Sequence, residues 1–179
     1  LVEALTHSSY SNEHGGSKQS PCNERLEFLG DSVLSVITSE YIYEKFSSSP
    51  EGDLTRMRSE LVCEKALADF ADEIGLGNYL LLGKGEERGG GRSRRSILAD
   101  AFEALIAAVY LDSATENDGR IAVRAYLLPL IEKKLGVLLT EWHGADYKTL
   151  LQQLIQRSDG ELLEYITVDE KGPDHAKVF

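Results

Sequence analysis

The stretch from Ile97 to Leu111, ILADAFEALIAAVYL, constrains the fold more than any other part of the chain. Only Asp100 and Glu103 are charged among its fifteen residues. A helix that is apolar almost all round is buried against several neighbours, so the sequence predicts a helical core around this segment. The two acids share one face at spacing i, i+3, and ionised acids beside a core are unfavourable unless they are paired or bind a cation. The alternative is that both acids face solvent, although such a helix leaves little exposed surface.

An earlier segment predicts a second acidic helix. Asn23 is the expected N-cap, and the helix is expected to reach about Phe46. Glu24, Glu27 and Asp31 fall within roughly 60° of one another at about 100° per residue. Three acids alone indicate a solvated face, whereas a matching acid pair on another helix favours a site shared by both helices. The apolar stripe predicted beside these acids consists of Leu26, Leu29, Val33, Val36 and Ile37.

Two such helices packed together would surround a cation with hard oxygen ligands. Carboxylates of this kind suit Mg²⁺ or Mn²⁺ rather than zinc, which prefers His and Cys. Mg²⁺ held by a few carboxylates is a common apparatus for phosphodiester hydrolysis. A di-iron bundle would need Glu-x-x-His pairs, and none of the four histidines follows a glutamate at that spacing. The HExxH, GxSxG and P-loop patterns are also absent, so the corresponding enzyme classes have no support.

The overall charge needs an explanation if the partner is a nucleic acid. The formal net charge is −11, whereas phosphate-binding surfaces are usually basic; bound cations and locally concentrated basic residues would reconcile the two. No run of eighteen apolar residues exists and no secretion signal is visible, so we expect no membrane partner and a cytoplasmic location. Cys22 and Cys63 lie outside any CxxC pair and are predicted to be free thiols.

The composition predicts two domains. Residues 1–138 are expected to form a mainly helical domain, residues 139–145 a linker, and residues 146–179 the beginning of an α+β domain. The second piece reads as a helix followed by strand-like runs, which bury little surface alone, so we expect the chain to stop inside that domain. Within the first domain we expect a Gly/Ser/Asn-rich loop before Pro21, a helical stretch from 51 to about 70, a polar loop over 83–95, and a helix over 120–134 that is bent or interrupted at Pro129.

The segment NERLEFLGDSVLS, at residues 23–35, resembles the signature of the ribonuclease III family. Further blocks resemble the same family in the same order and together cover nearly the whole chain. Chance is a poor explanation for so many ordered blocks. They are ALTHSS (4–9), EGDLTRMRSELV (51–62) and SILADAFEALIAAVYLDS (96–113), with DYKTLLQQ (146–153) and GPDHAKVF (172–179) in the family's double-stranded-RNA-binding domain.

The resemblance implies an all-helical catalytic domain that works as a homodimer on double-stranded RNA. Each subunit is then expected to hydrolyse one strand, giving 5′-phosphate and 3′-hydroxyl ends with short 3′ overhangs, in the processing of ribosomal and messenger RNA. The implied cofactor is Mg²⁺, for which Mn²⁺ is expected to substitute. The alternative is a non-catalytic double-stranded-RNA-binding scaffold on the same fold, which normally lacks the metal ligands.

The resemblance also assigns roles to particular acids. We expect Asp31 and Glu103 to matter most for the rate. Glu24 matches a family acid near the dimer and RNA surface, and Glu51 matches another near the cleavage valley, so both are accessory candidates. The family's metal ligands match Glu27, Asp31, Asp100 and Glu103, which are the acids that the helix pattern had already isolated.

In the second domain, the resemblance implies contact with the minor groove of duplex RNA. Proteins read that groove through shape, 2′-hydroxyls and phosphates. Each polar side chain taken alone would equally suit a solvated surface. The matching residues are Thr149, Gln152, Gln156 and His175, and a lysine-rich closing helix is expected after Phe179.

Two features of the first domain stay open at this point. The polar loop carries Lys84, Arg88, Arg92, Arg94 and Arg95. It is either a flexible solvated loop or a contact surface for phosphates or a partner subunit. Arg95 departs from the family pattern, which has Glu before SILAD. His7 matches a family histidine, and we expect it to stabilise a turn rather than to act in catalysis.

Overall fold

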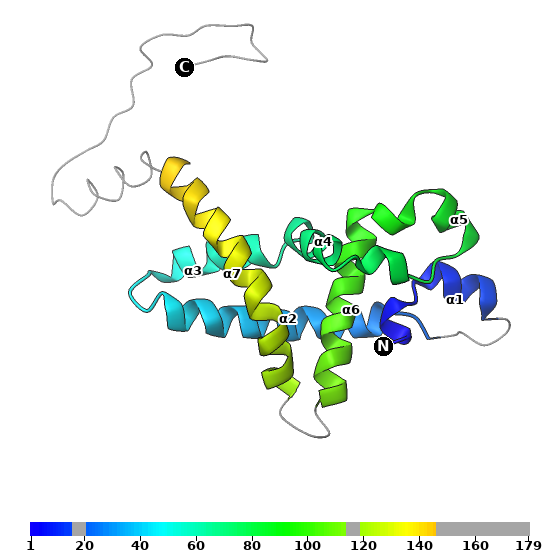
Figure 1. The fold of residues 1–179 in the computed structure, drawn as a ribbon. Helices are drawn as coiled ribbons and strands as arrows, with labels where there is room; N and C mark the ends of the chain where they lie inside the picture. The colour runs from blue at the N-terminus through cyan, green and yellow to red at the C-terminus, as the bar shows by residue number, and fades with distance from the viewer. Residues whose placement is uncertain (16–20, 114–118, 146–179) are drawn as a thin grey trace, which may run out of the picture. The chain divides into compact units, whose positions relative to one another are not determined.

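The structure is a computed structural model that describes residues 1–15, 21–113 and 119–145 (Figure 1). It divides into two units, Leu1–Gly136 and Val137–Phe179. The described residues are helical, and apart from an isolated parallel bridge between Thr6 and Leu81 they contain no strand pairing. The prediction that the first domain is helical is therefore confirmed over the described residues. The partial α+β domain predicted for 146–179 lies outside the described residues.

The breaks between helices follow from local sequence. Pro50 is the N-cap of α3, where its extended backbone ends the preceding turn. Gly75 closes α4 with φ 65, a left-handed conformation that glycine adopts without steric cost. The elements in chain order are η1 (Glu3–Leu5), α1 (Ser8–His14), α2 (Glu24–Lys45), α3 (Glu51–Leu61), α4 (Glu64–Glu73), η2 (Leu76–Tyr79), α5 (Lys84–Arg88), η3 (Gly91–Ser93), α6 (Arg95–Ser113) and α7 (Gly119–Ala145).

Helices α2 and α6 form the most extensive helix contact of the domain, and Figure 1 shows them crossing. Gly30 of α2 is buried at this crossing. A Cβ atom at Gly30 would overlap the carbonyl oxygen of Glu103 and lie 2.5 Å from its carbonyl carbon. The absence of a side chain at this one position therefore sets how closely the two backbones approach.

Helix α6 is buried on several sides, as its sequence predicts. Phe102 is fully buried, and its ring centroid lies 5.6 Å from that of Phe70 on α4. Burying a side chain of this size contributes about 1.5–3 kcal/mol to stability. The buried residues of α6 are Ile97, Leu98, Ala99, Ala101, Phe102, Ala104, Ile106 and Ala107.

Helix α7 is held mainly by an apolar stripe at four-residue spacing. Exposed ion pairs add to it, among them Arg124 with Glu44 on α2 and Lys134 with Asp69 on α4, both at 2.7 Å. Such pairs contribute at most about 1 kcal/mol each. Pro129 is exposed and lies inside α7, so of the predicted bend or interruption at this residue, the interruption does not occur. The stripe consists of Val123, Leu127, Ile131 and Leu135, each no more than 1% exposed.

The predicted stripe and cap of α2 are right only in part. Val33 and Ile37 are buried as expected, but Val36 is 50% exposed because α6 packs on the neighbouring face of the helix. Asn23 occupies the N-cap position, yet its side chain makes no capping hydrogen bond. That side chain is only 2% exposed, so it points into the protein rather than around the helix end.

Other boundaries also differ from the sequence predictions. Residues 8–14, expected in a loop, form α1. The single helical stretch expected over 51–70 is divided at Cys63, whose extended backbone caps α4. The loop at 83–95 is not simply flexible, since it contains α5 and η3. Residues 139–145, expected as a linker, continue α7 in the structure.

Two further sequence predictions concern the thiols and membranes. Cys22 and Cys63 are free cysteines, as predicted, and both are partly exposed. Among the described residues, no helix has both the length and the apolar character needed to cross a membrane.

The close crossing of α2 and α6 predicts an unequal response to the same substitution at two helical glycines. Gly30→Ala forces the helix backbones apart and should lower the free energy of unfolding by about 1–3 kcal/mol or more. Gly52→Ala, in α3, meets no atom within 4 Å and should be neutral or stabilising by up to about 1 kcal/mol. Urea unfolding of both variants measures the difference. Equal stabilities would contradict the role given to Gly30.

Candidate metal centre

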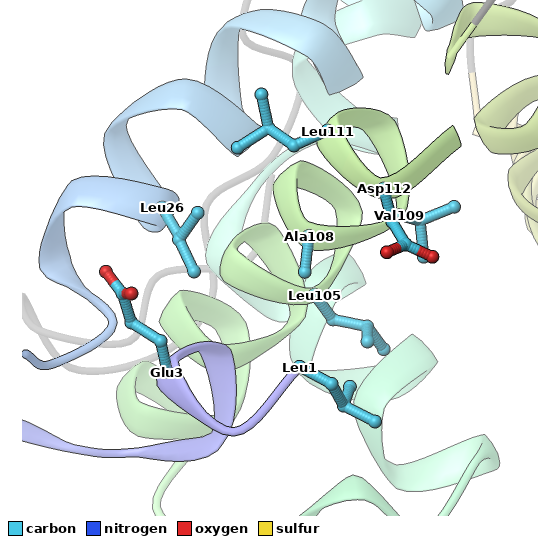
Figure 2. Close-up of a pocket in the computed structure, with 8 residues that line it drawn as sticks. All are labelled: Leu1, Glu3, Leu26, Leu105, Ala108, Val109, Leu111 and Asp112. Atoms are coloured by element: carbon cyan, nitrogen blue, oxygen red, sulfur yellow. The ribbon is translucent and has the colours of Figure 1, made fainter. Parts of the chain in front are cut away.

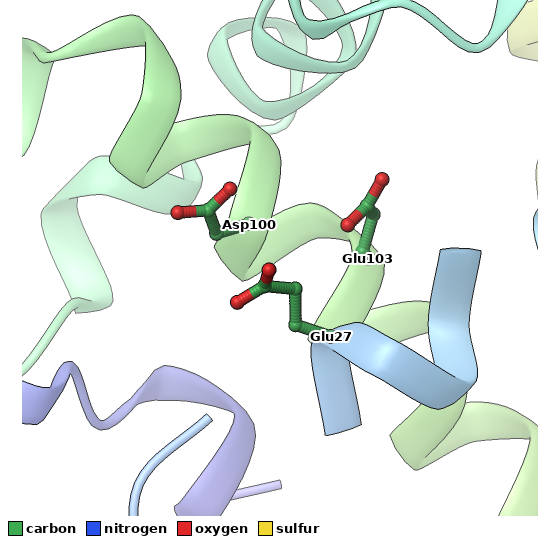
Figure 3. A group of neighbouring side chains, drawn as sticks. All are labelled: Glu27, Asp100 and Glu103. Atoms are coloured by element: carbon green, nitrogen blue, oxygen red, sulfur yellow. The ribbon is translucent and has the colours of Figure 1, made fainter. Parts of the chain in front are cut away.

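Three carboxylates from two helices converge beside the α2–α6 crossing. Oxygens of Glu27, Asp100 and Glu103 all lie within 4.8 Å of one another, and the three residues are half-buried. Figure 3 shows Glu27 extending from α2 towards the other two on α6. The two acids that the sequence singled out in the apolar helix therefore do not simply face solvent.

The local sequence explains why these side chains meet. Asp100 and Glu103 project from the same face of α6 because they are three residues apart. Glu27 lies one turn before Gly30, and Gly30 is packed on the Glu103 backbone. The glycine that permits the close crossing thus also brings Glu27 to the acid pair. Residues on the opposite face of α6 fill the core and keep the helix from rotating away.

Burial and the negative charge of neighbouring carboxylates raise the pKa of all three carboxyl groups. For Glu103 the pKa rises to about 8, first because of burial and then because of the charges of Asp31, Glu27 and Asp100. Burial, followed by the charge of Asp100, raises the pKa of Glu27. Burial and then the charge of Glu64 raise the pKa of Asp100, while His7 acts in the opposite direction. The site therefore disfavours its own negative charge.

No lysine or arginine within the described ranges forms an ion pair with any of these three carboxylates. The salt bridges of the domain lie elsewhere, as between Arg92 and Glu87. Oxygen-only ligands that repel one another suit a small hard divalent cation, which would relieve the repulsion that a core of this kind otherwise tolerates poorly. The residues therefore fit Mg²⁺ or Mn²⁺, and they offer neither the imidazoles nor the thiolates that zinc prefers.

Asp31 lies next to this group but not within it. The sequence placed Asp31 among four ligands, whereas the compact group contains three, and Asp31 is exposed on α2. Its charge is nevertheless the main electrostatic cause, after burial, of the raised pKa of Glu103. The carboxylate of Asp31 is therefore near enough to interact with a cation held by the other three.

The two accessory acids occupy different places. Glu24 is exposed in the first turn of α2, and its charge contributes to the raised pKa of Glu27. Glu51 begins α3, accepts a 2.7 Å hydrogen bond from Thr55, and lines a hollow with Glu40. That hollow lies at the far end of α2, on the order of 20 Å from Glu27 at 1.5 Å per residue. Within one chain Glu51 is thus separate from the carboxylate group.

The polar loop is more ordered than either sequence interpretation supposed. Arg92 pairs with Glu87 and donates to the Gly77 carbonyl, so it fixes the loop internally. Arg94 pairs with Glu86, and Arg95 with Asp69. Three of the five cations are thus neutralised by the protein itself. Within the part of the chain described here Lys84 and Arg88 form no salt bridge, although the charge of Lys84 helps to lower the pKa of Glu13.

Sequence reasoning missed one contributor to the site and underestimated another. Glu64 opens α4, and its charge helps to raise the pKa of Asp100. No sequence pattern joins these two residues, because only the packing of α4 on α6 brings them together. His7 stabilises a turn as predicted, since its ring accepts a hydrogen bond from the Ser9 backbone. It also lowers the pKa of Asp100. Thr149, Gln152, Gln156 and His175, the predicted RNA contacts, lie outside the described residues.

Over the described residues, the fold and this site define a helical domain with a carboxylate centre suited to a divalent cation. A family model described as Ribonuclease-III-like matches residues 1–130. The chain is 50% identical over 181 residues to ribonuclease 3 of Pelotomaculum thermopropionicum, covering 100% of this chain and 72% of that protein. Ribonuclease 3 of Caldanaerobacter subterraneus is 50% identical over 179 residues, covering 100% of this chain and 75% of that protein.

A solved structure agrees with these relatives. The nuclease domain of ribonuclease III from Campylobacter jejuni superposes with a TM-score of 0.65 at 42% sequence identity, covering 74% of this chain and 85% of that chain. The chain therefore belongs to the ribonuclease III family of endoribonucleases.

The raised pKa of Glu103 predicts how the metal-free protein responds to pH. The folded chain holds this proton up to about pH 8, whereas the ordinary value is 4.5. Between these values the folded state binds more protons than the unfolded state, so the free energy of unfolding falls as pH rises through that window. Glu103→Gln removes the ionisation and should flatten this slope, leaving the variant more stable above pH 8 by on the order of 1 kcal/mol after solvent screening.

Urea unfolding in EDTA across this pH range measures the effect. Glu60→Gln, at an exposed acid of α3, is the matched control and should leave the slope unchanged. If the parent chain and Glu103→Gln showed parallel pH profiles, the electrostatic account of the site would be wrong.

Proposed function

We propose that this protein hydrolyses phosphodiester bonds in double-stranded RNA with Mg²⁺, leaving 5′-phosphate and 3′-hydroxyl ends with short 3′ overhangs. The observation that carries the proposal is the carboxylate group of Glu27, Asp100 and Glu103 at the α2–α6 crossing, in a chain of the ribonuclease III family. Mn²⁺ is expected to substitute, because it accepts the same oxygen ligands. The natural substrates are proposed to be precursors of ribosomal and messenger RNA in the cytoplasm, a reducing compartment that suits two free thiols.

The residues of the site act mainly by binding and orienting. Glu27, Asp100 and Glu103 would hold the cation, and Asp31 would complete its surroundings from the exposed side. A divalent cation bound there supplies charge that lowers the pKa of water and stabilises a leaving oxygen. Glu103, with a pKa of about 8 in the metal-free chain, would release its proton when it becomes a ligand. Because Asp31 is exposed, a phosphate group could approach from that side.

The substrate would be held by groups outside the acidic centre. Lys84 and Arg88 are exposed on α5 and are available for phosphate contacts, which position a duplex without reading its sequence. Thr149, Gln152, Gln156 and His175 are proposed to contact the minor groove. A shape-based contact of this kind suits duplex RNA, whose major groove is too deep and narrow to admit side chains.

The activity test compares isosteric variants that remove one ionisable oxygen. Asp31→Asn and Glu103→Gln should each lower kcat on a long RNA duplex with Mg²⁺ by more than about 100-fold, the upper end of the effect of outer ligand changes. Glu60→Gln should cleave like the parent chain. Gel analysis of end-labelled duplex measures the products, and single-stranded RNA should stay intact.

The competing function is a non-catalytic scaffold that binds duplex RNA. The half-buried carboxylate group argues against this function. Acids that repel one another lower stability, and a scaffold that binds RNA without cleaving it gains nothing from them. Full activity of Asp31→Asn or Glu103→Gln would count strongly against the nuclease assignment. Binding of duplex RNA without cleavage, with Mg²⁺ supplied, would establish the scaffold instead.

We also propose that the chain forms a homodimer through the N-terminal end of α2. Phe28 is 79% exposed there. The same end of α2 also borders a hollow of about 520 Å³ between η1, α2 and α6, shown in Figure 2, whose lining includes the apolar side chains of Leu26, Leu105 and Val109. A protruding aromatic and a hollow at the same helix end suit a twofold-symmetric contact, in which each copy presents both features to the other. The similar Campylobacter jejuni nuclease domain is described as having a region involved in dimer formation.

Phe28→Ser should therefore shift the chain to a monomer at micromolar concentration without loss of stability, since little of the ring is buried in one chain. Tyr43→Ser is the matched control, because Tyr43 is an exposed aromatic on the same helix at 71%, about 22 Å further along its axis. Sedimentation equilibrium measures both. A dimer that survives Phe28→Ser, or a parent chain that is already monomeric, would contradict this interface.

A further inference from the structure

Helix α5 begins without a capping side chain of its own. Its N-cap is Gly83, and the helix has only five residues, so it is too short to be stable alone. The first N–H groups of a helix have no partner inside that helix. The start of α5 therefore needs acceptors from another element.

Side chains of α1 supply these acceptors, and Figure 1 shows the two helices next to each other. Ser9 Oγ accepts a hydrogen bond from the Gly83 N–H at 2.9 Å. Glu13 Oε2 accepts from the Lys84 N–H at 3.0 Å, and Glu13 Oε1 accepts from the Gly85 N–H at 3.5 Å. Because Ser9 and Glu13 are four residues apart, they share one face of α1. That face thus satisfies three successive N–H groups of α5.

Gly83 provides the space for this contact. A Cβ atom at Gly83 would lie 2.6 Å from Glu13 Oε1 and 2.7 Å from the Ser9 carbonyl oxygen. Its φ of −66 and ψ of 155 are open to any residue, so the glycine is required for space and not for backbone freedom. The missing side chain at Gly83 therefore lets the Glu13 carboxylate reach the start of α5.

Helix α5 presents two cations to solvent. Lys84 and Arg88 are exposed and four residues apart, so they lie on one side of the helix. Neither forms a salt bridge within the described residues, whereas Arg92 of the same loop is paired with Glu87. Two neighbouring cations on a fixed helix suit the phosphates of a duplex, which position it without reading its sequence.

We propose that Glu13 is a positioning residue for duplex RNA: by capping α5 from α1, it holds Lys84 and Arg88 in place to contact phosphates. The inference rests on the proposed function, which assigns these two cations to the substrate. A cap and a plain surface acid have opposite effects on RNA binding. Removing a plain acid beside Lys84 removes repulsion of the phosphates and strengthens binding, whereas removing the cap loosens the cations and weakens it.

The test measures binding of a long RNA duplex to the 179-residue chain by fluorescence anisotropy in EDTA, which withholds the metal. Glu13→Ala should raise the dissociation constant roughly 3–10-fold, because loss of a cap lowers the fraction of chains in which α5 is formed. Gly83→Ala should do the same, since its methyl group displaces the carboxylate. Glu13→Gln keeps an oxygen acceptor and should restore most of the parent affinity. Glu60→Ala, at an exposed acid of α3, is the control and should not weaken binding.

Two further measurements distinguish positioning from a general effect on the fold. In Glu13→Ala, hydrogen exchange of the amides at 83–85 should speed up without RNA, while the amides of α6 stay protected. With Mg²⁺ and saturating duplex, kcat should equal that of the parent chain while KM rises. Replacing both Lys84 and Arg88 by Gln should weaken binding in the parent chain and add little in the Glu13→Ala background, because the two changes act through the same contact.

Unchanged or tighter binding by Glu13→Ala would overturn the positioning role, and so would unchanged exchange of the amides at 83–85. If the chain with Gln at both 84 and 88 binds duplex like the parent chain, the inference also fails, whereas cleavage of duplex by the parent chain with Mg²⁺ would still support the proposed function. A parent chain that binds duplex but does not cleave it would overturn the nuclease proposal alone. A parent chain that neither binds nor cleaves duplex RNA would overturn both.

Discussion

The contact between Gly30 and the backbone of Glu103 is the constraint on which the rest of the domain depends. It lets α2 and α6 approach more closely than any side chain would allow, and that approach decides two things at once. On one side of α6 it closes the core around Phe102. On the other side it brings Glu27 of α2 to the acid pair of α6. Packing and chemistry are therefore linked through a single backbone contact.

The cost of this arrangement is electrostatic. Burial raises the pKa of all three half-buried carboxyl groups, and neighbouring acids, Asp31 beside Glu103 and Glu64 beside Asp100 among them, raise it further. A structural role would be better served by neutral residues, because partly buried like charges reduce stability. The cluster is understandable if a divalent cation belongs there, and the formal charge of −11 is then partly offset where it is most concentrated. The acids would then lower the stability of the metal-free domain while providing ligands for the cation.

The sequence predicted the components of the site better than its geometry. The apolar helix at 97–111 and the acids on α2 could be read from periodicity alone, because burial imposes a helical repeat on the residue types. The arrangement of the acids depends on the crossing angle and on α4, which no local pattern encodes. For this reason no sequence pattern could show that Glu27, Asp100 and Glu103 form the compact group while Asp31 lies beside it, and Glu64 was missed. The helix in the loop at 83–95 escaped prediction because pairs such as Arg92–Glu87 offset its glycines.

The most direct test of the central claim is an anomalous diffraction map from crystals soaked in Mn²⁺. The account predicts a peak between α2 and α6, about 2.0–2.3 Å from oxygens of Glu27, Asp100 and Glu103, with Asp31 close by on the exposed side. No peak at saturating Mn²⁺, or carboxylates that point apart into solvent, would contradict it.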